Sequence, residues 1–335
     1  MQILVTGGAG FIGGHLAESF VADGHDVVVF DSFDAYYHRG IKDHTVERCR
    51  AVAAESEGSY TLRRGDIRER EDVRAAFDAA APDVVYHQAA QAGVRISVEQ
   101  PTHPNAVNVG GTLTVLDAAR ETGVDRVVIA SSSSVYGKTH YLPYDEDHPQ
   151  EPVSPYGVTK LAGDHYARVY DDLYDLSTVC LRYFTVYGPR MRPNMAISNF
   201  TSRCLNDEPP VIYGNGAQTR DFTYVDDVVA ANRTLLTSDA ADGMVLNVGS
   251  GDTIDITELA ETVRDLVNPD LGIEHRERIA GDAEHTQADV SRARDVIGYE
   301  PTTPIREGVE RFVEWYRANR EWYEPLVVAS REGGS

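Results

Sequence analysis

Three side chains in this sequence, Ser132, Tyr156 and Lys160, have the types and the spacing of an acid–base site. Tyr156 and Lys160 are four residues apart, so on a helix they lie on the same face. A free tyrosine, with a pKa of about 10, is a poor base at neutral pH, but a nearby ammonium group favours the phenolate. Such a tyrosine could remove a proton from a substrate hydroxyl group while the serine hydrogen-bonds the same oxygen.

The surrounding sequence predicts the elements that would bring these residues together. The serine belongs to the run 131–134, which follows the apolar residues 127–130, a pattern typical of a buried strand. Pro155 suits the first turn of a helix, and apolar residues follow it at helical spacing. We therefore expect a strand that ends at the serines and a helix that begins near Pro155.

A second candidate site lies at the N-terminus, where a strand, a glycine-rich turn and a helix follow one another. Glycines at positions 7, 10 and 13 permit a tight turn and the close approach of a pyrophosphate, which the helix N-terminus attracts. Asp31 ends the next strand-like run, 21 residues after Gly10, where a carboxylate bonds ribose hydroxyls and repels a 2′-phosphate. This context favours an NAD site that excludes NADP over the alternative, a glycine-rich turn with a surface aspartate.

Further strand-like runs at 60–63, 83–86 and 178–182 alternate with helical patterns. This alternation predicts an α/β fold with a doubly wound parallel sheet of the Rossmann type, whose ligands lie beyond the carboxyl ends of the strands. Asp66, after the third strand, is placed to meet the adenine amino group, although it could equally cap the next helix. The residues expected to hold the cofactor are Gly7, Gly10, Phe11, Ile12, Gly13, Asp31, Asp66, Ile67, Ala89, Ala90, Gln91, Asn108, Tyr156, Lys160 and Tyr183.

The length of 335 residues allows one large domain with a smaller lobe. We expect residues 1–182, together with about 222–248, to form the cofactor-binding domain. Residues 183–221 and 249–330 would form a smaller mixed α/β substrate lobe, and 331–335 a disordered tail. Two segments of the lobe, residues 183–194 and 213–222, are rich in arginine and aromatic residues. This composition predicts either a wall that binds anions and rings or arginines paired to an acidic surface.

The composition is strongly acidic, with a net charge of −22, and contains three lysines against 28 arginines and 30 aspartates. Nucleic acid is therefore not an expected partner. Such a surface favours a cytoplasm of high salt, with an ordinarily acidic protein as the alternative. The three cysteines form no close metal-type pair, so no metal is expected. A signal peptide and an apolar run of membrane-spanning length are both absent, which predicts a cytoplasmic location away from membranes.

The segment from Thr6 to Gly13, the serine run with Val135-Tyr136-Gly137, and Tyr156-x-x-x-Lys160 together resemble the extended short-chain dehydrogenase/reductase family, and more narrowly its nucleotide-sugar epimerases and dehydratases. The resemblance covers nearly the whole chain. It implies bound NAD, a nucleoside-diphosphate sugar in the C-terminal lobe, a homodimer, and Ser132 as the catalytic serine. Dehydratases of the family carry Asp-Glu, and related decarboxylases a Glu at the second position, where this chain has Ser133 and Ser134. The resemblance therefore favours epimerisation.

Three runs, residues 31–37, 91–95 and 185–193, resemble those of UDP-glucuronate 4-epimerases, in which the arginine matching Arg192 faces the sugar carboxylate. Thr185 stands where UDP-galactose 4-epimerases often carry Asn, although some archaeal relatives with similar loops are assigned to UDP-glucose. We therefore expect UDP-glucuronate slightly ahead of UDP-glucose or UDP-galactose. The expected substrate residues are Arg95, Ser132, Ser133, Thr185, Arg192, Asn199 on the uracil side, Arg220 at the diphosphate and Asp282 at the ribose.

Three alternatives stay open. Arg220 and Asp282 could each belong to a surface ion pair instead. The protein could be a dehydratase, a decarboxylase or a net oxidoreductase of the same fold. It could also be a non-catalytic nucleotide sensor, a reading that the complete set of Ser132, Tyr156 and Lys160 argues against.

Overall fold

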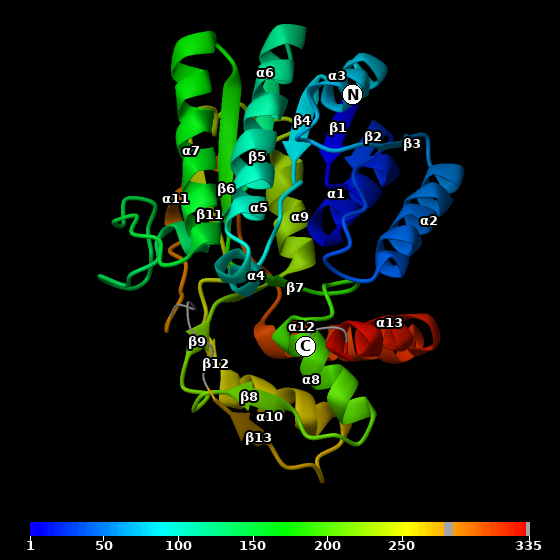
Figure 1. Cartoon of the computed structure of the whole chain (residues 1–335), viewed down its shortest axis with the longest axis vertical. Coiled ribbons are helices and arrows are strands. Elements are labelled where there is room, and N and C mark those ends of the chain that lie inside the picture. The colour runs from blue at the N-terminus through cyan, green and yellow to red at the C-terminus, as the bar shows by residue number, and fades with distance from the viewer. Residues whose placement is uncertain (278–283, 333–335) are drawn as a thin grey trace.

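A seven-stranded parallel sheet forms the centre of the molecule (Figure 1). The computed structural model describes residues 1–277 and 284–332. The strands lie in the order β11-β6-β5-β4-β1-β2-β3. Their bounds are β1 (Gln2–Thr6), β2 (Asp26–Asp31), β3 (Ser59–Arg64), β4 (Val84–His87), β5 (Arg126–Ser132), β6 (Ser177–Tyr183) and β11 (Val245–Val248). The order reverses at β1 and β4, so a ligand crevice is expected beyond the carboxyl ends of these strands.

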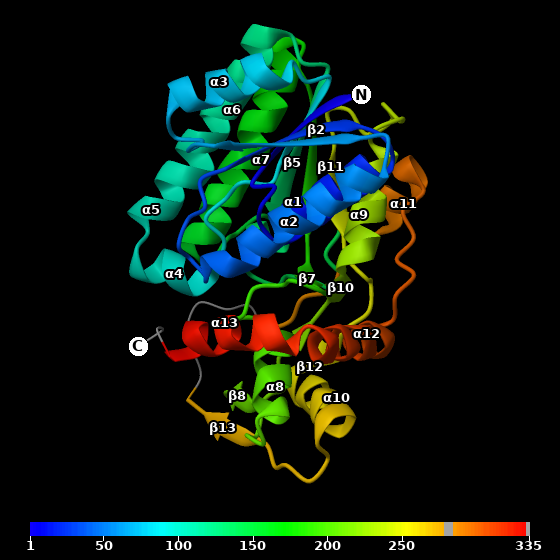
Figure 2. The same ribbon diagram turned by 90° about the vertical axis from the view of Figure 1, so that its right-hand side faces the viewer.

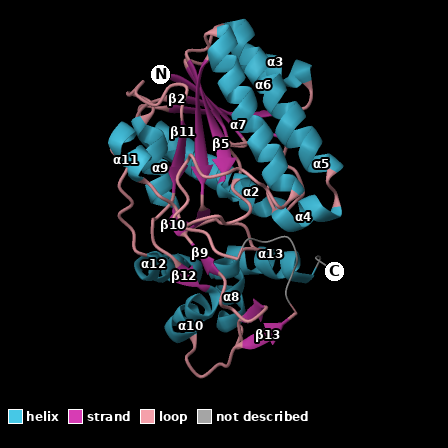
Figure 3. Cartoon of the chain, turned by 90° about the vertical axis from the view of Figure 1, so that its left-hand side faces the viewer, coloured by secondary structure: helices cyan, strands magenta, loops and turns pink. Residues whose placement is uncertain are grey.

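Helices cover both faces of this sheet. Strands β1, β4 and β5 are almost entirely buried, which is why their sequences are continuous apolar runs. One face packs against α1 (Phe11–Ala22), α2 (Arg39–Glu55) and α9 (Val225–Thr234), and the other against α3 (Arg70–Ala80), α6 (Thr112–Thr122) and α7 (Pro155–Tyr174) (Figures 2 and 3). The doubly wound α/β fold that the sequence predicts is confirmed.

A smaller α/β region lies beyond the carboxyl ends of the central strands (Figure 1). It contains α8 (Ala196–Leu205), α10 (Ile256–Val267), α12 (Ile305–Ala318) and α13 (Arg320–Glu332). Three strand pairs accompany these helices: β7 (Thr185–Tyr187) with β10 (Phe222–Tyr224), β9 (Thr219–Arg220) with β12 (Ile254–Asp255), and β8 (Val211–Tyr213) with β13 (Glu274–Arg276). Between these segments the chain returns to the sheet through α9 and β11, and α11 (Ser291–Ile297) packs beside β11.

The helix that precedes β5 begins with a π-helical turn, Asn105–Gly111, and becomes α-helical at Thr112. The expected tail 331–335 overlaps the end of α13, and its residues 333–335 lie outside the described part of the chain.

Two further findings concern the described residues only. None of their helices is long and apolar enough to cross a membrane. Their histidine, cysteine, aspartate and glutamate side chains form no group of three or more that could hold a metal ion.

Candidate active site

A cavity lies at the carboxyl ends of the central strands, where the sequence predicts the ligands. Strands β1 to β6 each contribute to its wall at their carboxyl ends or just beyond them, through Gly7, Asp31, Asp66, Ala89, Ser132 and Tyr183 respectively. Gly10, Phe11, Ile12, Gly13, Ile67, Ala90, Gln91, Ser133, Tyr156, Lys160, Thr185 and Arg192, all expected at the site, line it as well. Most of the residues expected to bind cofactor or substrate therefore surround one space.

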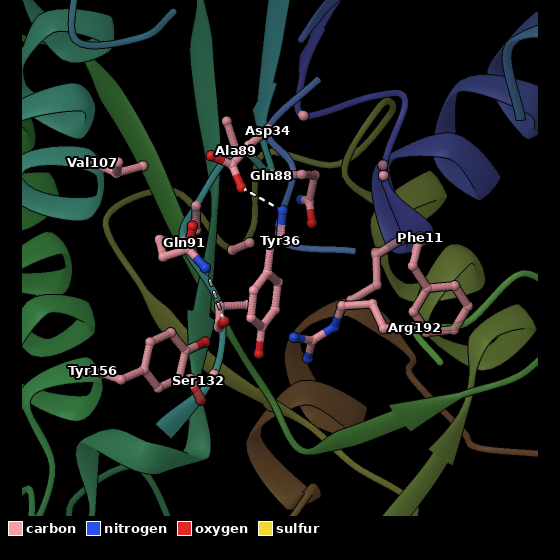
Figure 4. Close-up of a pocket in the computed structure, with 18 of the residues that line it drawn as sticks. Phe11, Asp34, Tyr36, Gln88, Ala89, Gln91, Val107, Ser132, Tyr156 and Arg192 are labelled. Carbon is pink, nitrogen blue, oxygen red and sulfur yellow. Dashed lines mark hydrogen bonds between the residues drawn. The ribbon is translucent and has the colours of Figure 1, made fainter. Parts of the chain in front are cut away.

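Helix α7 brings Tyr156 to the wall beside Ser132 (Figure 4). The helix starts as expected, with Pro155 in its first turn and the Ser154 hydroxyl accepting a hydrogen bond from the Gly157 N–H at 3.1 Å. Ser132 is the last residue of β5, and its hydroxyl accepts a hydrogen bond from the Ser134 N–H at 3.2 Å. One turn beyond Tyr156, the Lys160 ammonium donates to the Ala130 carbonyl of β5 at 2.7 Å. Helix and strand thus fix the three side chains together.

Burial and hydrogen bonds set the charge states at this wall. Burial raises the pKa of Tyr156, and the hydrogen bond with Ser132 and the charge of Arg192 offset part of that rise. Burial also lowers the pKa of Lys160 to about 8, although Asp164, one helical turn further on, opposes this effect. The Lys160 ammonium is directed to the Ala130 carbonyl of β5, and the lowering of the tyrosine pKa by Lys160 together with a bound nicotinamide ring stays a prediction.

Asp31 is held at the end of β2 by three protein donors. Its carboxylate accepts hydrogen bonds from the N–H groups of Phe33 at 2.7 Å and Ala9 at 3.1 Å. The Lys42 ammonium, from α2, lies 3.4 Å from the same carboxylate in a buried ion pair. The carboxylate is therefore fixed in orientation before any ribose binds to it.

Asp66 also lines the cavity, but it does not cap a helix. Helix α3 begins at Arg70 with Glu69 as its N-cap residue, so the helix-cap explanation is wrong. The Asp66 carboxylate instead accepts a hydrogen bond from the Arg68 N–H at 2.9 Å and pairs with the Arg68 guanidinium at 2.6 Å. This hydrogen-bonded guanidinium holds the pKa of Asp66 below its usual value.

The residues at the glycine-rich turn fit a dinucleotide. Gly7 has φ +70°, and a Cβ atom there would lie 2.7 Å from the Ala89 backbone, so a side chain at position 7 is excluded. Two polar atoms of the cavity-lining residues, Gln88 Oε1 and Ser131 Oγ, are buried without a hydrogen-bond partner in the described part of the chain. Buried polar atoms normally have partners, so these two atoms are suited to a polar ligand.

The segment 184–195, which we call the arginine arm, forms the opposite wall. The Arg192 guanidinium lies over the Tyr36 ring, 5.5 Å from its centroid, and the Asn194 amide donates to the Tyr36 hydroxyl at 3.2 Å. Behind the wall, Arg190 is buried and pairs with Glu18 of α1. The sequence predicts that arginines of this segment either form ion pairs or line an anion-binding wall. Arg190 forms an ion pair, and Arg192 lines the cavity wall.

Four of the expected site residues that the structure describes do not line this cavity, and a fifth, Asp282, falls outside the described part of the chain. Arg95 is exposed on α4 (Val94–Glu99) and pairs with Glu99 at 3.0 Å. Asn108 is buried behind the wall, where it bonds the Gln91 backbone and Thr159. Arg220 is buried and donates to the carbonyls of Thr219 and Glu284. Asn199, on α8, is also absent from the lining.

Tyr36 and Lys42 are among the lining residues that were not predicted from the sequence. Tyr36 belongs to the run 31–37 that carries the resemblance to glucuronate epimerases, but the run alone does not say which side chain turns inward. Lys42 is one of only three lysines, and its survival in so lysine-poor a chain was a usable signal.

Known proteins are similar to this chain over most of its length. The profile of the NAD dependent epimerase/dehydratase family matches residues 3–249. A probable UDP-glucuronate 4-epimerase of Rhizobium meliloti is 35% identical over 95% of this chain and 98% of its own length. A putative UDP-glucose 4-epimerase of Methanocaldococcus jannaschii is 35% identical over 95% of this chain and 99% of its own length.

Two solved structures are also similar to this chain over nearly its whole length. The UDP-glucuronic acid 4-epimerase of Bacillus cereus, in complex with UDP-glucuronic acid and NAD, has a TM-score of 0.86 and 33% identity, over 95% of this chain and 99% of that one. The UDP-glucose 4-epimerase of Thermotoga maritima, with UDP-glucose, has a TM-score of 0.88 and 30% identity, over 96% and 100%.

Proposed function

The chain belongs to the NAD-dependent epimerase/dehydratase family, and we propose that it is a UDP-sugar 4-epimerase whose preferred substrate is UDP-glucuronate. The observation that carries this proposal is the cavity itself. Tyr156 and Ser132 lie on one wall, and the guanidinium of Arg192 lies on the other, over the Tyr36 ring (Figure 4). An acid–base group and an anion-binding group thus face the same space as the glycine-rich turn.

In the proposed reaction, Tyr156 removes the proton of the sugar 4-hydroxyl while Ser132 hydrogen-bonds the same oxygen. NAD, held by the glycine-rich turn and Asp31, would supply the hydride acceptor and donor for C4, on opposite faces of the sugar in the two half-reactions. Tyr156 then gives its proton back to the new hydroxyl. The burial that raises the tyrosine pKa keeps the phenol protonated without ligands, so proton removal depends on positive charge nearby. Arg192 supplies part of that charge.

The residues after Ser132 direct the chemistry toward epimerisation. Ser133 and Ser134 line the cavity next to the catalytic serine and offer hydroxyl groups rather than carboxylates. Loss of water from the sugar needs a general acid at this place, and a hydroxyl group is a poor one. Oxidation at C4 followed by reduction is the reaction that these side chains support.

The glucuronate preference depends on Arg192. A guanidinium presents two parallel N–H donors to a carboxylate and cannot be deprotonated, so it distinguishes a C6 carboxylate from a C6 hydroxyl. Relatives named for either sugar are about equally similar to this chain, so the support for UDP-glucuronate comes from this side chain and its place in the cavity.

The test is to incubate the protein separately with UDP-glucuronate, UDP-glucose and UDP-N-acetylglucosamine in high salt, and to identify the C4 products by NMR. We expect UDP-galacturonate from UDP-glucuronate at the highest kcat/KM, without net NADH. Accumulation of a keto sugar or of NADH would indicate a dehydratase or a net oxidoreductase. Absence of turnover with all three sugars, while UDP-sugar binding persists, would indicate a nucleotide sensor.

We also propose that the protein is a homodimer. Four apolar side chains on one face of α7, namely Val158, Tyr166, Val169 and Leu173, are between 36% and 69% exposed. A row of this kind on a helix is unusual for a free surface and suits contact with a second copy. Light scattering should give twice the mass of the chain, and L173E should give one chain mass. A monomeric wild type would contradict the proposal.

A cytoplasm of high salt is the proposed environment. The support is the net charge of −22 combined with only three lysines. Screening ions relieve the repulsion between so many carboxylates, so folding and activity should fall as KCl is removed. Full activity and an unchanged melting temperature at low ionic strength would contradict this proposal.

A further inference from the structure

Tyr36 stands between the catalytic wall and the arginine arm (Figure 4). Two residues of the arm contact it. The Arg192 guanidinium lies over the ring, 5.5 Å from the centroid, and the Asn194 amide donates to the hydroxyl at 3.2 Å. On the other side, Tyr36 faces the wall that carries Tyr156 (Figure 4). Burial raises the pKa of Tyr156, Tyr36 adds to this rise, and Arg192 opposes it. One aromatic ring therefore separates the acid–base group from the anion-binding group.

The loop that carries Tyr36 is fixed to the end of β2. The Asp34 carboxylate accepts a hydrogen bond from the Tyr36 N–H at 2.9 Å, and the Asp31 carboxylate accepts one from the Phe33 N–H at 2.7 Å. Phe33 has φ +57°, a conformation that a non-glycine residue keeps only where its surroundings enforce it. The Arg64 guanidinium covers the Phe33 ring, 4.4 Å from its centroid. The loop is thus held in place by two side-chain hydrogen bonds and by the contact of Arg64 with Phe33.

The loop after β4 leaves room for the Tyr36 hydroxyl. Gly93 has φ +118°, and a Cβ atom at this position would lie 2.3 Å from the Tyr36 oxygen. The ring therefore occupies a slot that is formed by a glycine on one side and by the arginine arm on the other.

We propose that Tyr36 is a positioning residue that selects the anionic sugar by holding the Arg192 guanidinium toward the C6 carboxylate. The inference rests on the proposed function, because it concerns a residue that positions Arg192, the group proposed to bind the carboxylate of UDP-glucuronate. An arginine side chain that is free in solvent loses rotamer freedom when it binds an anion, and a guanidinium already stacked on a ring has lost most of it. This saving in side-chain entropy favours only a substrate whose carboxylate binds Arg192. The Tyr36 ring should therefore strengthen the binding of UDP-glucuronate and have little effect on that of UDP-glucose.

The experiment compares Y36L, which removes the ring, with Y36F, which keeps the ring and removes the hydroxyl. Dissociation constants for UDP-glucuronate and UDP-glucose are measured by calorimetry on the NAD-loaded protein, with kcat/KM for each sugar alongside. In Y36L we expect affinity for UDP-glucuronate to fall about tenfold, with UDP-glucose changed less than about twofold. Y36F should keep most of the wild-type preference. Unchanged NAD content and melting temperature serve as controls for folding.

A double-mutant cycle tests whether Tyr36 acts through Arg192. R192M should also lose the preference for UDP-glucuronate, and adding Y36L to R192M should then have little further effect. Equal losses for both sugars in Y36L, or additive losses in the double variant, would overturn the role of Tyr36.

The two hypotheses fail in different ways. A wild type that binds both sugars equally and is unaffected by R192M would overturn the glucuronate substrate itself. A wild type that prefers UDP-glucuronate through Arg192, with Y36L retaining that preference, would overturn only the inference about Tyr36.

Discussion

Arg190 and Glu18 join the arginine arm to helix α1 through an ion pair in which Nη2 lies 2.6 Å from Oε2. His15, one turn earlier on α1, takes part in the same contact: its Nε2 bonds the Pro189 carbonyl at 2.8 Å, and Arg190 bonds its Nδ1 at 3.1 Å. Burial, aided by the charge of Arg190, lowers the pKa of His15 to about 3, so the ring is neutral and its Nδ1 can accept. Helix α1, which follows the glycine-rich turn, and the arginine arm, which carries Arg192, are therefore joined by buried polar contacts.

Loss of the contact between Arg190 and Glu18 should weaken the binding of both NAD and UDP-glucuronate. R190M leaves Glu18 partly buried with one partner fewer, and the loss of a buried pair costs about 3 kcal/mol of unfolding free energy. We expect weaker retention of both NAD and UDP-glucuronate, measured by dialysis and calorimetry, with denaturation by urea giving the stability. R48M is the matched control, because Arg48 is the exposed partner of the same carboxylate and should cost less than about 1 kcal/mol. Equal losses in the two variants would contradict the role given to Arg190.

Y156F removes the proposed base and leaves the ring in place. We expect kcat to fall by about a thousandfold, the middle of the range for general acid–base catalysis, with UDP-sugar affinity nearly unchanged. Steady-state kinetics and calorimetry measure the two quantities. The control is Y141F, since Tyr141 is exposed and outside the cavity, and it should behave as the wild type. Substantial activity in Y156F would refute the role of the phenol.

The pH dependence should report Lys160. Its folded pKa of about 8 lies below the usual 10.5, so the ammonium is present below pH 8 and is lost as the pH rises through 8. If the reaction needs this charge, kcat/KM falls on the alkaline side near pH 8, and the limb disappears from the residual activity of K160R, whose guanidinium does not titrate. An alkaline limb that persists in K160R would assign it to another group.

The same shift has the opposite sign for stability. The buried ammonium destabilises the folded state while it is charged, and the folded protein binds fewer protons than the unfolded chain between pH 8 and 10.5. The Lys160 contribution to the unfolding free energy therefore rises across this window.

K42M tests the support of Asp31. The change removes a buried charged donor that lies 3.4 Å from the carboxylate, although the N–H groups of Phe33 and Ala9 remain. We expect the NAD dissociation constant to rise about tenfold, the effect of one lost charge-assisted hydrogen bond. Fluorescence titration of the cofactor-free protein measures it. K138M, at an exposed lysine paired with Glu151, is the control and should leave NAD binding unchanged. Unaltered NAD affinity in K42M would show that Lys42 is only structural.

The sheet and the catalytic wall could be predicted because local pattern decides them. Apolar runs such as 127–130 become central strands that are buried on both faces, and Ser154-Pro155 starts α7 by local capping. The glycine-rich turn is equally local. Tyr156 and Lys160 share a face through helical periodicity alone, so their position needed no tertiary information.

Residues placed by tertiary contacts could not be predicted in the same way. Arg95 turns outward to Glu99, four residues on, and the i, i+4 spacing of opposite charges was the available warning. Arg220 has the residue type of an anion-binding side chain, yet it donates to the carbonyl of Glu284, 64 residues further along the chain, which no local pattern reveals.

The return of the chain to the central sheet through α9 and β11 has a consequence for how the molecule can be divided. A fragment that ended at residue 182 would contain the whole glycine-rich turn and all three proposed catalytic side chains, and would still lack β11, the partner of β6. Strand β6 would become an open edge with unpaired N–H and carbonyl groups, and α1 would lose the cover of α9. Such a fragment should aggregate rather than bind NAD, so the gene cannot be split at a single point into separate cofactor-binding and substrate-binding proteins.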